Sequence, residues 1–172
     1  GETAVADHPE QGTMAGGSVR CPFCPTTVPA DDVKAQARAG QSGRFLYAVA
    51  YSTDGETGLR FRPATQADRD AYRAAAEALA AAEAAHDDPF LSLVPDEPIG
   101  PGGGRWLNVV RHGVSTWGEL HNARQSLALA TFARLVRRSH AELLTAGAAS
   151  DAARALALYL GLTCSRLVIR MA

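Results

Sequence analysis

The chain has 172 residues, of which 47% are hydrophobic and 20% are charged, which excludes the composition of a disordered chain or of a multi-span membrane protein. Its length suffices for one domain or for two small lobes. Residues 1–100 carry 8 basic and 15 acidic side chains (net −7) and residues 101–172 carry 9 and 3 (net +6), so the C-terminal part is the candidate for nucleic-acid binding.

The first part of the chain predicts one short helix after a turn that contains two cysteines. Residues 1–18 have several glycines and little hydrophobic periodicity, so we expect a disordered start. Asp31 and Asp32 are suited to begin a helix that Gly40 would end. Ordered structure is therefore expected from about residue 19.

A β-hairpin is expected next. Residues 45–51 are apolar at both odd and even positions, which indicates a strand that is buried on both faces. Residues 53–55 (Thr-Asp-Gly) are typical of a turn, and residues 59–62 would return as the second strand. Arg60 and Arg62 would share the outer face of that strand.

A long helix and a loop follow the hairpin. Thr65 stands three residues before Asp68, which is the spacing of a capping box, and a helix is predicted over about Gln66–Ala85. This helix is rich in alanine and has few bulky side chains, so we expect it to be peripheral. Residues 87–105 contain four prolines and four glycines and are expected to form a linker.

The strongest helix signals lie near the middle of the basic part. Thr116 precedes Glu119 by three residues and Asn122 precedes Gln125 by three, so two helices should begin in succession. The second start leads into residues at helical spacing that form an apolar stripe. This stripe comprises Leu127, Ala130, Phe132, Leu135 and Val136.

These signals predict an α+β fold that ends in a helical hairpin. Gly147 would end the first helix of the hairpin, and Ser150 would cap the second, Asp151–Met171. In this interpretation residues 19–86 form a small zinc-knuckle and β-hairpin lobe, 87–105 form the linker, and 106–172 form a basic helical lobe truncated at its C-terminus.

Cys21 and Cys24 are the candidate metal ligands. Their spacing is that of a zinc knuckle, which supplies two of the four ligands that a tetrahedral site needs. Cys164 lies in an apolar helix, where a cysteine usually acts as a small hydrophobic residue. Unmetallated structural thiols are the alternative, and redox chemistry is a weaker one because no thioredoxin-like context is present.

The basic side chains supply the candidate nucleic-acid contacts. Arginine side chains on the predicted hairpin can bind phosphate, and Arg124 would stand in the first turn of a helix, where anions bind. The candidates are Arg124, Arg134, Arg137, Arg138, Arg154, Lys34 and Arg38. The alternatives are solvated surface arginines and arginines that meet acidic surfaces elsewhere.

No secretory signal is visible, and the most apolar stretch, residues 155–169, is interrupted by Arg166. We therefore expect a cytoplasmic protein with no membrane contact. Three cysteines in that compartment favour metal binding or free thiols over disulfides.

Six blocks of sequence, in order, resemble one family of proteins. They read CPFCPTTVPADDVKAQARAG (Cys21–Gly40), RFLYAVAYSTDG (Arg44–Gly55), LRFRPATQAD (Leu59–Asp68), PDEPI (Pro95–Ile99), WGELHNARQSLALATFARLVRR (Trp117–Arg138) and LALYLGLTCSRL (Leu156–Leu167). The family is that of the large bacterial adenine-specific (N6) DNA methylases, some of them linked to phage defence. His121 and Ser126 depart from it, because the family pattern has Phe and Leu there.

The resemblance implies an α/β parent enzyme that transfers a methyl group from S-adenosylmethionine to adenine N6 in DNA. It also implies a second cysteine pair elsewhere in the parent, which would make Cys21 and Cys24 half of a zinc ribbon. A glycine-rich cofactor turn after a strand is absent from this sequence, and the nearest approach to the catalytic Asp/Asn-Pro-Pro-Tyr/Phe loop, residues 88–90, has one proline. We therefore expect an internal segment without catalytic or cofactor-binding residues, whose partners are DNA and the rest of the methyltransferase.

Two other interpretations remain open. The chain could be a stand-alone zinc-dependent module that binds nucleic acid or protein without catalysis, or a purely structural interaction domain. Salt-dependent DNA binding would argue against the purely structural one, because counterion release requires phosphate contacts.

Overall fold

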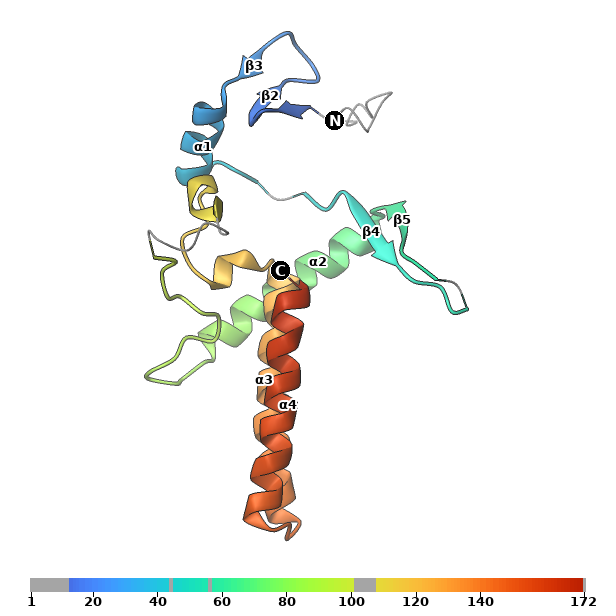
Figure 1. Cartoon of the computed structure of the whole chain (residues 1–172), viewed down its shortest axis with the longest axis vertical. Helices are drawn as coiled ribbons and strands as arrows, with labels where there is room; N and C mark the ends of the chain where they lie inside the picture. Colours follow the sequence, from blue (N-terminus) through green and yellow to red (C-terminus); the bar gives the residue numbers. More distant parts are fainter. Residues whose placement is uncertain (1–12, 44, 56, 101–107, 172) are drawn as a thin grey trace. The chain divides into compact units, whose positions relative to one another are not determined.

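The computed structural model describes residues 13–43, 45–55, 57–100 and 108–171 (Figure 1). Within these ranges the fold is α+β, as predicted, with two small antiparallel sheets and four α-helices. The chain divides into two compact units, Gly1–Phe45 with Pro98–Ser115 and Leu46–Glu97 with Thr116–Ala172. Each unit is built from two separate segments of the chain. The sequence predicted consecutive lobes instead, with boundaries at 19–86, 87–105 and 106–172, and this division stays a prediction.

The first unit contains a three-stranded sheet of β1 (Met14–Ala15), β2 (Ser18–Arg20) and β3 (Thr27–Val28). Met14 pairs with Val19, so strand pairing begins before residue 19, earlier than the sequence indicates, and the expected disorder of residues 1–18 stays a prediction. The glycines between β1 and β2 adopt φ values of 58° and 86° and make a tight turn. Residues 1–12 of the expected disordered start lie outside the described residues.

Helix α1 (Ala30–Arg38) confirms the predicted short helix, with Asp31 and Asp32 in its first turn. It packs against the 3₁₀-helix η2 (Asn108–His112). Gly113, at φ 84°, lies so close to α1 that an added Cβ would come within 2.3 Å of the Ala37 carbonyl oxygen. This close approach buries Ala37.

The second unit begins with a hairpin of β4 (Ala48–Tyr51) and β5 (Arg60–Pro63), in which Val49 pairs with Arg62. The turn is where the sequence predicted it, but the first strand is shorter and is not buried. Tyr47, just before it, is 72% exposed. A two-stranded sheet covers little apolar surface. The continuous apolar run of residues 45–51 therefore indicated a buried strand where the structure has a largely exposed one.

Helix α2 (Gln66–Ala84) begins with the predicted capping box between Thr65 and Asp68. The Asp68 carboxylate also accepts two hydrogen bonds from the Arg62 guanidinium, at 2.6 and 2.9 Å. Arg62 is therefore not simply on the outer face of β5, as the sequence predicted; it ties the hairpin to the start of α2. Helix α2 packs against α3.

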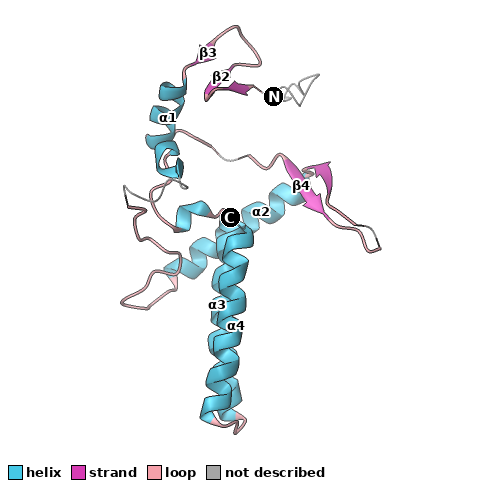
Figure 2. Cartoon of the chain, viewed as in Figure 1, coloured by secondary structure: helices cyan, strands magenta, loops and turns pink. Residues whose placement is uncertain are grey.

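Helices α3 (Ala123–Thr145) and α4 (Ser150–Met171) form the predicted αα-hairpin (Figure 2). The Asn122 side chain accepts a hydrogen bond from the Gln125 N–H at 3.1 Å, and Gln125 Oε1 accepts one from the Asn122 N–H at 2.8 Å. Gly147 adopts φ 84° just after α3, which is the predicted helix stop.

The predicted apolar stripe of α3 packs only in part, because Leu127, Ala130 and Val136 are half-buried. Ser126 is buried on α3, whereas Phe132 and Leu135 are 41% and 44% exposed. On α4, Ala153 is fully buried. The most buried positions of the two helices are thus held by small residues, while the larger side chains of the hairpin are half-buried or exposed.

Helix α4 is apolar on more than the side that meets α3. By length and composition Ser150–Ile169 could cross a membrane, with a mean hydropathy of 1.4, and only 6% of its most apolar window is buried. Its largest exposed side chains include Leu158, Tyr159, Leu162 and Ile169. The expectation that the protein avoids membranes stays a prediction.

Candidate functional site

The two candidate metal ligands lie in a β-hairpin loop of the first unit. The loop joins β2 to β3, which pair from Val19 to Val28, and is closed by a hydrogen bond of 2.9 Å from the Cys21 N–H to the Thr26 carbonyl. The Phe23 N–H donates to Cys21 Sγ at 3.5 Å. These two contacts hold the Cys21–Cys24 turn within the hairpin loop.

The Cys24 thiol has hydrogen-bonding neighbours within the turn. Its pKa is lowered from the ordinary value, chiefly by the Thr26 hydroxyl, then by the Thr26 backbone N–H and by the Cys21 side chain. Cys24 is exposed and Cys21 half-buried, so a metal ion or an oxidant in solvent can reach this turn.

The ligand set in the described chain is nevertheless half complete. No group of three or more histidine, cysteine or acidic side chains comes together anywhere in the described ranges. Two thiolates alone do not fill the tetrahedral shell that a structural zinc ion requires. The turn thus fits one half of a zinc site and does not fit a complete one.

Two basic residues of α1, Lys34 and Arg38, interact with the Asp31 carboxylate of the same helix. Lys34 Nζ lies 2.9 Å from Asp31 Oδ1, and this hydrogen bond, with the charges of Lys34 and then Arg38, lowers the pKa of Asp31. Lys34 is thus engaged within its own helix, whereas Arg38 is exposed at the helix end. Of this pair, Arg38 is the better placed to meet phosphate.

The arginines of α3 divide into two groups. Arg138 Nε lies 2.7 Å from Glu142 Oε1, one turn further along the helix. Arg124, Arg134 and Arg137 are exposed, and no ion pair joins them to a carboxylate in the described part of the chain. We call these three residues the α3 arginine face, a broad surface because, at 100° per residue, they spread over about 140° of the helix circumference. Arg124 stands on the first turn of α3, where helix N–H groups also favour an anion.

Arg154, the remaining candidate, lies on α4. Its guanidinium is 3.8 Å from Asp151, and both side chains are largely exposed. Such a long, solvated pair is weak, so Arg154 retains access to solvent but stands on an otherwise apolar helix. The structure thus places four of the seven candidates on α3, two on α1 and one on α4.

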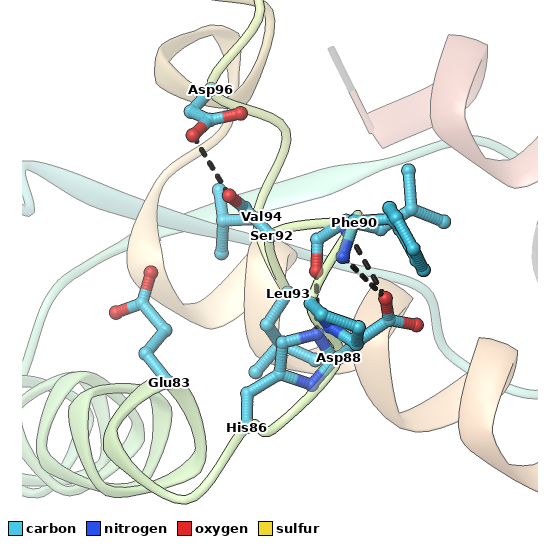
Figure 3. Close-up of a pocket in the computed structure, with 10 residues that line it drawn as sticks. Glu83, His86, Asp88, Phe90, Ser92, Leu93, Val94 and Asp96 are labelled. Atoms are coloured by element: carbon cyan, nitrogen blue, oxygen red, sulfur yellow. Dashed lines mark hydrogen bonds between the residues drawn. The ribbon is translucent and has the colours of Figure 1, made fainter.

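The loop after α2 forms a polar hollow of about 460 Å³, drawn in Figure 3. Asp88 Oδ1 accepts hydrogen bonds from the backbone N–H groups of Phe90 (2.9 Å) and Leu91 (3.1 Å), and these bonds lower the pKa of Asp88. His86 Nε2 lies 2.8 Å from the Leu91 carbonyl oxygen. The Asp88 carboxylate therefore holds a turn, and residues 88–90 lie in a loop, as predicted.

A second, apolar cavity of about 330 Å³ was not predicted. It is lined by the segment before Gly118, by the first turns of α3 and by the last turns of α4. Gly118 lies at its rim and packs against the preceding loop, where an added Cβ would come within 2.5 Å of the Pro95 carbonyl oxygen. The missed signal is the run of small residues on α3, Ser126, Ala130 and Ala133, which leaves space where leucines would fill it.

Comparisons with protein-family models, with curated proteins and with solved structures found no match to this chain. The arrangement of its residues therefore carries the functional argument together with the sequence resemblance.

Proposed function

We propose that this chain is a non-catalytic segment of an S-adenosylmethionine-dependent adenine N6 DNA methyltransferase, in which it serves as scaffold and DNA-facing surface in the cytoplasm. The observation that carries the DNA-facing role is the α3 arginine face. These guanidinium groups are exposed and form no salt bridge within the described chain, although the charge of Arg137 contributes to the lowered pKa of Asp88, whereas Lys34 and Arg138 each have a close carboxylate partner. The parent activity rests on the ordered sequence blocks.

A scaffold role is supported by the apolar surface that the second unit leaves open. Soluble chains that act alone rarely expose a row of large apolar side chains like those of α4. One oxygen of the Asp88 carboxylate, Oδ1, accepts two backbone N–H groups and so serves the turn. In this proposal the methyl-transfer chemistry and its cofactor belong to other parts of the parent protein.

DNA binding by the α3 arginine face is tested by fluorescence anisotropy of a labelled duplex over a salt series. We expect the triple variant Arg124→Gln, Arg134→Gln, Arg137→Gln to weaken binding and to reduce the salt slope by roughly 2–3, at about 0.9 for each lost phosphate contact. The matched control is Arg138→Gln, whose guanidinium is paired with Glu142. An unchanged slope in the triple variant would refute the DNA-facing role.

A second candidate, a stand-alone zinc-dependent module, is favoured by the Cys21–Cys24 turn with its lowered Cys24 pKa. The two candidates differ in zinc affinity. As part of a methyltransferase the turn needs cysteine ligands from elsewhere, so this chain should bind zinc weakly and release it to a mild chelator.

Zinc titration with a colorimetric chelator measures this difference, with Cys21→Ser as the control variant. Weak binding that disappears in the variant supports the methyltransferase segment. One tightly held zinc ion per chain would instead support the stand-alone module.

A further inference from the structure

The apolar cavity of the second unit is formed by three segments whose positions are fixed by contacts with one another. The Gly118 N–H donates to the Pro95 carbonyl oxygen at 2.9 Å, which holds the segment before α3 against the loop at residues 93–95. His121 Nε2 lies 3.4 Å from the Val168 carbonyl oxygen, where the start of α3 meets the last turns of α4. All three segments belong to the same unit of the chain. The walls of the cavity are therefore set by the fold of this unit.

The lining of this cavity is neutral and largely apolar. It includes Leu120, Leu129 and Val168, together with Trp117, which is 43% exposed. No arginine, lysine, aspartate or glutamate is among the described residues that line it. A charged ligand would lose its hydration there without gaining an ion pair, so the cavity favours an uncharged one.

One polar side chain of the lining has no partner within the described chain. Ser126 is only 8% exposed, and its backbone N–H makes the ordinary helical hydrogen bond to the Asn122 carbonyl oxygen at 2.9 Å. Its hydroxyl makes no hydrogen bond in the ranges that the structure describes. Every fully enclosed side-chain nitrogen or oxygen in those ranges has a partner, so the Ser126 oxygen is not sealed in the interior and is reached from the cavity. An occupant that hydrogen-bonds to this hydroxyl would satisfy it.

The volume of the cavity indicates the size of the occupant. A cavity of about 150 Å³ lined by leucine, isoleucine and phenylalanine stays dry and binds benzene. The cavity between the loop, α3 and α4 is larger, at about 330 Å³, which leaves room for two fused aromatic rings. Such rings also gain a favourable contact with the indole of Trp117.

We propose that this cavity is a binding site for an uncharged molecule of about two aromatic rings that carries one polar group, which exchanges a hydrogen bond with the Ser126 hydroxyl. Apolar contacts with the lining provide most of the affinity, and Ser126 fixes the orientation of the ligand. The site does not depend on the proposed DNA-facing role, because none of its residues belongs to the α3 arginine face.

Two probes that differ by a single hydroxyl, 1-naphthol and naphthalene, test the site on the 172-residue chain. Equilibrium dialysis should show saturable binding of one molecule of either probe per chain. Ser126→Ala should weaken the binding of 1-naphthol by about two- to tenfold, which is the effect of one hydrogen bond. The same variant should not weaken the binding of naphthalene, which has no polar group to lose a partner.

A variant with a filled cavity tests where the probes bind. Ala130 lies one turn after Ser126 in the lining and is half-buried. Ala130→Leu places a larger side chain in the cavity and should weaken both probes by more than about tenfold, because the two groups cannot share the space. Circular dichroism checks that the helices of the variant remain formed.

Two controls separate the cavity from the rest of the surface. Ala141→Leu makes the same substitution at an exposed position of α3 outside the lining. Leu158→Ser removes a 62% exposed apolar side chain of α4 that is also outside the lining. Both variants should bind the probes as the wild type does.

Three results would overturn the proposal. Without saturable binding of either probe, the cavity would be left to water or to a side chain of another polypeptide. Wild-type binding by Ala130→Leu, or a loss in Leu158→Ser as large as in the filled variant, would assign the probes to the exposed surface. An affinity for 1-naphthol that Ser126→Ala leaves unchanged would show that Ser126 is not the polar contact.

Discussion

The two helices of the αα-hairpin have similar lengths and pack on each other, yet they present different chemistry to solvent. Exposed arginines lie on α3, whereas α4 exposes large apolar side chains such as Leu158, Leu162 and Ile169. The most buried residue of each helix is small, Ser126 on α3 and Ala153 on α4. The hairpin therefore separates the face that stabilises the fold from the faces that are available to partners.

The largest expected effect comes from filling the contact between the two helices. Ala153→Leu adds three carbon atoms where the side chain is fully buried, and we expect a loss of about 3 kcal/mol of unfolding free energy. Ala152→Leu, on the exposed side of α4, should change stability little. Urea unfolding followed by circular dichroism measures both variants, and equal losses would show that α4 does not pack through Ala153.

A smaller loss is expected at the approach to α3. Gly118→Ala would place a Cβ 2.5 Å from the Pro95 carbonyl oxygen and 2.5 Å from Val94 Cγ1, and the Gly118 N–H already donates to Pro95 at 2.9 Å. We expect a loss of about 2 kcal/mol. Gly43→Ala is the control, because an added Cβ there meets nothing within 4 Å. A Gly118 variant as stable as the control would contradict the close packing of this loop.

The start of α3 should contribute less again. Asn122→Ala removes one half of the capping box, and we expect a loss of about 1 kcal/mol. Asn122→Ser keeps an acceptor oxygen and should recover most of it. Thermal unfolding of the two variants checks this, and equal melting temperatures would mean that the cap does not stabilise α3.

The smallest expected effect is a pH dependence of stability. It should be present at the cap of α2, which contains the Asp68 carboxylate, and absent at the neutral cap of α3. Hydrogen bonds from Arg62 and then Thr65 hold the pKa of Asp68 far below its usual range. A depressed pKa contributes stability above the unfolded value of about 4, and that contribution is lost as pH falls through the folded pKa. The stability advantage of the wild type over Asp68→Asn should therefore shrink below about pH 4, whereas the difference between wild type and Asn122→Ala should stay constant.

Urea midpoints measured across an acid pH series test this contrast. If the Asp68 difference also stayed constant down to strongly acid pH, the Arg62 pair would not be formed in solution.

Features encoded within a few residues were predictable from the sequence. The capping boxes at Thr65 and Asn122 depend on side chains three residues apart, so their spacing is sufficient to find them. Gly40 and Gly147 end helices for the same local reason, which is their left-handed φ. The α+β class and the αα-hairpin follow from these signals.

Features that depend on packing between elements were not predictable. The sequence placed Arg62 on an outer face, because nothing local indicates that it reaches Asp68 six residues away. It assigned Leu135 to the packed stripe of α3, although the small Ser126 is the residue that is buried. The candidate cysteines and basic residues could be named from residue type. Which basic residues have a carboxylate partner, such as Lys34 and Arg138, could be seen only in the structure.

The tip of the hairpin offers a practical handle on this protein. Ala146 and Gly147 are exposed, Gly147 is left-handed, and an added Cβ there meets nothing within 4 Å. Exposed tips of this kind tolerate insertions. A fluorophore or an affinity tag can therefore be inserted between Gly147 and Ser150. This position lies at the opposite end of α3 from Arg124, and the insertion changes none of the α3 arginines.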